Sequence, residues 1–139
     1  MNHFNFNYFS HMKTKIVLTV LAIIGLAATA FTLKESSEVK HVVIFKYKAG
    51  TTQPQIDEVT NAFRDLKNKI PGIISFESGV NNSPEKLNKG FTHVYLLTFK
   101  DAASRDAYLP HPDHKKFGDL LTRLPVVEDV FVVDFSPEK

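Results

Sequence analysis

The sequence contains no cysteine among its 139 residues. Disulfide bonds, thiolate catalysis and metal centres with cysteine ligands are therefore all excluded. The folded part of the chain must be held together by its hydrophobic core or by association of chains. At this length the chain has room for one domain with an appendage.

The sequence also lacks a strong excess of either charge. It has 17 Lys and Arg against 15 Asp and Glu, which leaves a formal net charge of +2. Lys13 and Lys15 account for this excess, because the part from residue 31 onward has equal numbers of basic and acidic side chains. A nearly neutral domain gives no electrostatic reason to expect nucleic-acid binding.

Charge is absent altogether from residues 16–33, IVLTVLAIIGLAATAFTL. Residues 16–27 are typical of the hydrophobic region of a signal peptide, and residues 28–30, Ala-Thr-Ala, match the small-residue pattern before a cleavage site. We therefore interpret residues 1–30 as a signal peptide and expect the protein to be exported to the periplasm or the cell exterior. Since 18 uncharged residues could just span a bilayer, an uncleaved membrane anchor is the alternative.

The remaining chain divides into a polar linker, residues 31–38, and one patterned domain, residues 39–137. Alternating apolar residues predict strands, and apolar residues spaced three and four apart predict helices. The order is β-α-β-β-α-α-β, with strands expected over 41–48, 73–80, 91–99 and 128–136 and helices over about 54–69, 101–109 and 114–124.

This order indicates an α+β fold of the ferredoxin-like type, a four-stranded antiparallel sheet with helices on one face. The strands are apolar on both faces, although helices can cover only one of them. A bare apolar sheet face is typical of an association surface. We therefore expect a homodimer in which two sheets close into a barrel.

Residues 108–114, YLPHPDH, combine possible turn formers with possible proton-transfer groups. The prolines favour the end of one helix and the start of another, with His111 flanking or capping the second helix. Imidazole and phenol groups can donate or accept protons, so Tyr108 and His114 are candidates for a site. The strand histidines His41 and His93 are further candidates, although the pattern around each one, taken singly, favours a structural core histidine that is satisfied by hydrogen bonds.

Four stretches of the sequence resemble the stress-responsive alpha/beta barrel domain (Dabb) family: KHVVIFKYK, GFTHVYLLTF, YLPHPDHKKFGD and VFVVDFSP. The resemblance implies a dimeric α+β barrel. It also implies site residues, because His41, His93, Tyr108 and His114 look like the active-site residues of a plant polyketide cyclase of the family. In that enzyme the last histidine is the proposed general base and the tyrosine assists it.

A histidine metal site is an alternative use of these residues. His111 and His114 are three residues apart, and His41 and His93 could converge on them. However, no acidic residue has a convincing ligand spacing, and a zinc motif such as H-E-x-x-H is absent from the sequence. We therefore expect neither a metal nor another cofactor.

Two functions follow as hypotheses. The first is a dimer that binds a small hydrophobic ligand in a pocket lined by His and Tyr. The second is a small acid–base enzyme of the cyclase or lyase type, which acts on a carbonyl compound with His114 as base and Tyr108 as donor. Because polyketide intermediates are made in the cytosol, export argues against a true polyketide cyclase.

The export hypothesis predicts that protein recovered from the native host begins near Phe31, after cleavage at the Ala-Thr-Ala pattern. N-terminal sequencing of the purified protein checks this. A soluble cytosolic protein that begins at Met1 or Met12 would contradict it.

Overall fold

The computed structural model describes residues 37–138. The expected signal peptide, and nearly all of the expected linker, lie outside the described residues. Within the described range, no helix is long and apolar enough to cross a membrane.

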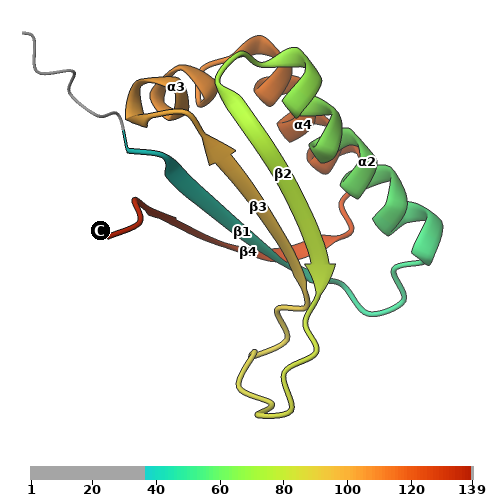
Figure 1. The fold of residues 1–139 in the computed structure, drawn as a ribbon. Coiled ribbons are helices and arrows are strands. Elements are labelled where there is room, and N and C mark those ends of the chain that lie inside the picture. Colours follow the sequence, from blue (N-terminus) through green and yellow to red (C-terminus); the bar gives the residue numbers. More distant parts are fainter. Residues whose placement is uncertain (1–36, 139) are drawn as a thin grey trace, which may run out of the picture. The chain divides into compact units, whose positions relative to one another are not determined.

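Four strands and three helices follow the predicted order, with labels as in Figure 1. The elements are β1 (Val39–Tyr47), α2 (Gln53–Lys69), β2 (Ile73–Val80), β3 (His93–Phe99), α3 (Ala102–Tyr108), α4 (Pro112–Arg123) and β4 (Val127–Phe135). The predicted third strand was two residues too long at its start, because the Phe91 N–H is bonded to the Asn88 carbonyl in a turn. The last helix begins at Pro112, the proline expected to start it, two residues before the range 114–124 that the apolar pattern indicated.

The sheet is antiparallel in the order β2-β3-β1-β4, which confirms the ferredoxin-like prediction. Figure 1 shows the helices on one side of this sheet. The first strand lies in the middle and pairs with the last strand of the chain. In that pairing His41 is the direct partner of Asp134. Two residues 93 positions apart in sequence are thereby brought side by side.

The core fills the space between the sheet and the helices. Alternate residues of β1 and β3 face it, and α2 contributes the apolar stripe that its spacing predicted. The buried hydrophobic residues are Val39, Val43, Phe45, Val59, Phe63, Leu66, Ile70, Ile73, Tyr95, Leu97, Phe99, Tyr108, Phe117, Leu120 and Val126. His41 is the one histidine among the buried residues of the described chain.

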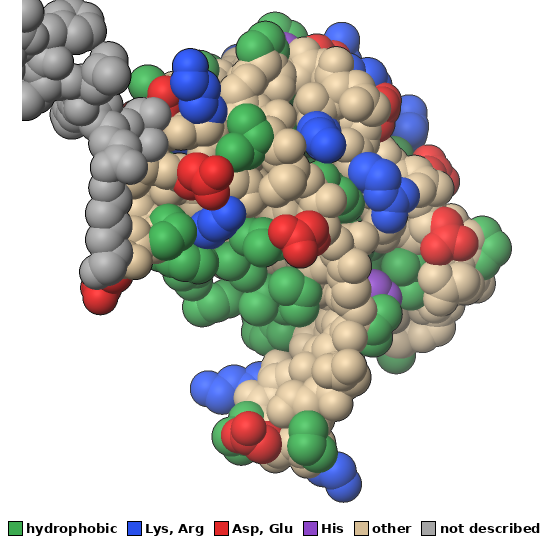
Figure 2. Space-filling view, viewed as in Figure 1, with side chains coloured by type: hydrophobic (Ala, Val, Ile, Leu, Met, Phe, Trp, Pro, Cys, Tyr) green, Lys and Arg blue, Asp and Glu red, His purple; other side chains and the backbone are tan. Residues whose placement is uncertain are grey.

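The opposite face of the sheet carries apolar side chains that no helix covers. Strand alternation places Ile44 and Val94 on this open face, next to Phe131, Val133 and Phe135 of β4. The three β4 residues keep 40–51% of their surface exposed. Figure 2 shows hydrophobic side chains gathered over the strands. The predicted bare apolar face is therefore present.

The YLPHPDH stretch forms the corner between α3 and α4. Helix α3 ends at Tyr108, and Pro112 is the first residue of α4, where its missing N–H is not needed. The imidazole Nδ1 of His111 accepts the N–H of Asp113 at 3.2 Å. His111 is thus the N-cap of α4, as predicted. The chain reverses at this corner and brings Tyr108 and His114 onto one cavity.

Candidate functional site

A cavity of about 260 Å³ lies between the α3–α4 corner and the sheet. Most of its lining is apolar, and its polar side chains are His41, Tyr108 and His114. The lining consists of His41, Val43, Phe45, Phe63, Tyr108, Leu109, His114, Phe117, Gly118, Leu121, Val130 and Val132. An apolar cavity with a few convergent polar groups is the usual form of a small-molecule site.

His41 is held by an ionic network at the β4 edge of the cavity. Its Nδ1 lies 2.6 Å from a carboxylate oxygen of Asp134, and the other carboxylate oxygen accepts a hydrogen bond from the guanidinium of Arg105 on α3. The carboxylate can only accept, so the His41 Nδ1 carries the proton in this bond. In the neutral ring, Nε2 is then the atom with a free lone pair.

The charge of Asp134 is maintained by the same network. Burial alone would raise the pKa of this carboxyl group, but the hydrogen bonds from His41 and Arg105 and their charges lower it overall. An ionised Asp134 fixes the orientation and the tautomer of His41, as carboxylates commonly do for functional imidazoles.

Tyr108 and His114 approach each other across the corner. Their rings lie 4.2 Å apart between centroids, and the ring of His41 lies 5.7 Å from that of Tyr108. The Nδ1 of His114 is 3.0 Å from the carbonyl oxygen of Leu109. A carbonyl accepts only, so Nδ1 of His114 also bears the proton, and Nε2 is left as an acceptor.

Tyr108 is suited to donate a hydrogen bond. Only 1% of its surface is exposed. Burial, with a smaller contribution from the negative charge of Asp134, raises the pKa of its phenol. The phenol therefore stays protonated across the physiological range. The cavity thus combines one phenol donor with two imidazole acceptors, a set that can bind a carbonyl oxygen and receive a proton from a nearby carbon.

His93 does not join the other three predicted site residues. It lines a separate cavity of about 140 Å³ between α2 and the strands β2 and β3. Its Nδ1 is hydrogen-bonded to the hydroxyl of Thr92 at 2.9 Å, and burial lowers the pKa of its imidazole. The four histidines of residues 37–138 do not converge on a metal site, and the structure shows no cluster of three or more metal-ligating side chains in this range.

Sequence reasoning missed Asp134 and Arg105. The sequence offers one indication of Asp134, because this residue is the one acid in the apolar strand FVVDF. Its pairing with His41 depends on the strand register, which the sequence pattern alone does not fix. Arg105 lies three residues before Tyr108, one turn earlier on the same face of α3.

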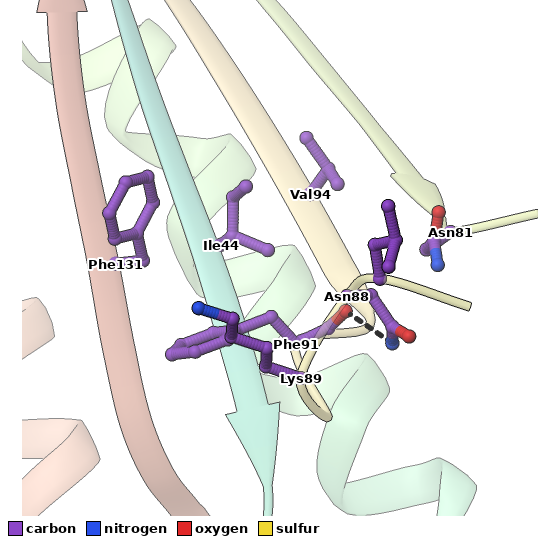
Figure 3. Close-up of a pocket in the computed structure, with 8 residues that line it drawn as sticks. Ile44, Asn81, Asn88, Lys89, Phe91, Val94 and Phe131 are labelled. Atoms are coloured by element: carbon purple, nitrogen blue, oxygen red, sulfur yellow. Dashed lines mark hydrogen bonds between the residues drawn. The ribbon is translucent and has the colours of Figure 1, made fainter. Parts of the chain in front are cut away.

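A separate hollow, of about 490 Å³, lies on the open face of the sheet. Figure 3 shows Ile44, Val94 and Phe131 of three neighbouring strands beside the loop that carries Phe91. A hydrogen bond of 2.9 Å from the amide of Asn88 to the Phe91 carbonyl closes this loop. The hollow belongs to the uncovered apolar surface and contains none of the predicted site residues.

Comparison with known proteins relates the whole folded domain to one family. The family described as "Stress responsive A/B Barrel Domain" matches residues 39–137. Olivetolic acid cyclase of Cannabis sativa is 29% identical over 73% of this chain and 98% of its own length.

Two solved structures show the same fold. A hydroxynitrile lyase from Passiflora edulis is 27% identical, with a TM-score of 0.66 over 74% of this chain and 95% of its own. A dimeric ferredoxin-like protein of unknown function from Jannaschia is 26% identical. Its TM-score is 0.61, over 72% of this chain and 99% of its own.

The His41–Asp134 pair predicts a specific dependence of stability on pH. Because folding lowers the Asp134 pKa, its stabilising contribution is full above its ordinary value of 3.8 and is lost as the pH falls through the lower folded-state pKa. Asp134→Asn should lower the free energy of unfolding at pH 7 by about 1.5–3 kcal/mol, a typical value for hydrogen bonds to charged groups. The loss should shrink as the pH falls below about 4.

Urea denaturation across this pH range measures the effect. Asp129→Asn is the matched control, since Asp129 lies exposed on the same strand and bonds only the backbone N–H of its neighbour Val130 at 2.8 Å. An equal, pH-independent loss in both variants would contradict the role of the pair.

Proposed function

Since the chain belongs to the stress responsive A/B barrel domain family, we propose that it is a homodimeric barrel protein that binds a small hydrophobic carbonyl compound beside His41, Tyr108 and His114. The observation that carries this proposal is the convergence of these three polar side chains in one otherwise apolar cavity. The apolar walls favour a hydrophobic ligand, and the polar groups fix the orientation of its carbonyl.

The contacts of each polar group suggest its part in binding. The Tyr108 phenol donates a hydrogen bond to the carbonyl oxygen of the ligand. His114 presents Nε2 as an acceptor, because its Nδ1 is engaged by the Leu109 carbonyl. His41 presents a second acceptor, which Asp134 holds in place.

The Asp134–His41 pair supports a second candidate function, catalysis by acid–base chemistry. A base that removes a proton from the carbon next to the carbonyl, beside a phenol that stabilises the developing oxyanion, performs the first step of aldol-type reactions. In this reading His114 is the base, Tyr108 the donor, and His41 stabilises the charges that form. Similar proteins include a cyclase and a lyase. If residues 1–30 are cleaved as expected, the protein binds its ligand outside the cytosol.

The uncovered apolar face of the sheet supports the proposed dimer. Residues such as Phe131 and Val133 leave a continuous apolar surface and a hollow there, which a second copy of the sheet would cover. Burying several hundred Å² of apolar surface, at about 25 cal/mol per Å², favours association strongly. A dimeric structure is described for the similar protein from Jannaschia.

Introducing a charge on this face tests the dimer. The protein should have a dimer mass at micromolar concentration, and Phe131→Glu should shift it to monomer because the carboxylate would be buried without a partner. Leu109→Glu is the control, since Leu109 is 49% exposed, close to the 51% of Phe131, but lies on the helix side. Light scattering that returns a monomer for the unmodified protein would overturn the dimer.

The binding site is tested with His114→Ala and methyl butyl ketone as the probe. The ketone should shift the NMR signals of His41, Tyr108 and His114, and His114→Ala should weaken its affinity about tenfold, because the ligand loses the packing of the imidazole ring that lines the cavity. Dimer mass should be unchanged. His111→Ala is the control, because His111 caps the same helix without lining the cavity.

Equal binding by both variants would contradict the role of His114. Unfolding or dissociation of the His114→Ala protein would show instead that this histidine is structural. Absence of any ketone-induced shift in the unmodified protein would overturn the proposed function.

A further inference from the structure

Two cavities lie on the helix side of the sheet and share no lining residue. The first contains His41, Tyr108 and His114, and the second contains His93. The first is bordered by side chains of β1 and β4, and the second by side chains of the adjoining strands β2 and β3. Their separation needs a physical barrier, because the sheet itself runs continuously past both.

The barrier is one layer of aromatic rings, which we call the aromatic wall: Phe45, Phe63 and Tyr95. Phe45 and Phe63 line the first cavity, and Tyr95 lines the second. The Tyr95 ring lies 5.0 Å from that of Phe45 and 5.2 Å from that of Phe63, between centroids. Each of the three residues is at most 2% exposed. The wall leaves no room for a chain of the ligand to pass.

The wall is also held rigidly. The Tyr95 hydroxyl is hydrogen-bonded to the hydroxyls of Thr60 at 2.9 Å and Tyr47 at 3.0 Å. The Phe63 ring stacks on Phe117 at 4.6 Å between centroids. Moving either ring aside would break buried hydrogen bonds or tight core packing, both of which are costly. The wall is therefore a fixed boundary.

The boundary limits the size of the site. The first cavity, at about 260 Å³, lies just below the range of roughly 300–1,000 Å³ that is typical of pockets for drug-sized ligands. Together with the second cavity, of about 140 Å³, it would fall inside that range. The open direction is instead toward β4, where Val130 and Val132 are 42% and 50% exposed.

We propose that the aromatic wall restricts the ligand to a compact carbonyl compound with a short apolar substituent, and that His93 takes no part in its binding. This inference rests on the proposed function. A longer substituent has to extend past β4 toward the surface, since the wall closes the inner end. Phe45, Phe63 and Tyr95 are thus the residues that set ligand length.

A series of methyl ketones of increasing chain length tests the wall in the unmodified protein. Affinity should rise about fourfold for each methylene that still fits inside, the value expected for burying one CH₂. It should then stop rising at longer chains, which leave the cavity. In NMR titrations, all binding ketones should shift the signals of His41 and His114, and none should shift those of His93.

Opening the wall should change both results. In Phe63→Leu, and separately in Phe45→Leu, affinity should continue to rise for ketones beyond the original limit, and methyl octyl ketone should shift the His93 signals. Phe76→Leu is the matched control: Phe76 packs 5.6 Å from Phe63 between ring centroids but lines neither cavity. It should keep the original limit.

The possible results distinguish a failure of the aromatic wall from a failure of the proposed binding function. Ketones that bind at His114 and also shift the His93 signals of the unmodified protein would overturn the wall while leaving the function intact. An unchanged length limit in the folded wall variants would do the same. If no ketone shifts His41, Tyr108 or His114, the proposed function fails and the inference fails with it.

Discussion

The pairing of β1 with β4 in one register is the constraint on which the site depends. It places His41 opposite Asp134, on the side of the sheet that the helices cover. A slip of β4 by one residue would move Asp134 to the other face, away from His41, because side chains alternate along a strand. The same slip would turn the apolar residues of the open face, such as Phe131, toward the helices. The register thus determines both the cavity and the association surface.

Helix α3 joins this arrangement to the corner that follows it. Arg105 bonds the carboxylate of Asp134, while Tyr108 at the end of the same helix contacts His41 and His114. Pro112 starts α4 directly after the reversal, so His114 lies in its first turn. One strand pair and one helix corner therefore supply every polar group of the cavity. The surrounding core residues exclude water and strengthen the interactions among these groups.

Much of the fold could be predicted from sequence because apolar periodicity reports which face of each element is buried. The corner at residues 108–114 was also predictable, since proline geometry is local. The separate location of His93 was not. It follows from how the rings of Phe45, Phe63 and Tyr95, which are far apart in sequence, fill the space between helix and sheet. Arg105 and Asp134 escaped prediction for the same reason, as their contacts require a known register.

The proposed site requires two imidazoles that present Nε2 to a ligand while Nδ1 is held by the protein. The most direct measurement is the ¹⁵N NMR spectrum of the histidine side chains in the folded protein, which distinguishes the two tautomers. For neutral His41 and His114, the contacts with Asp134 and the Leu109 carbonyl predict a protonated Nδ1 and an unprotonated Nε2. A protonated Nε2 with an unprotonated Nδ1 in either neutral ring would contradict the proposed arrangement of the site.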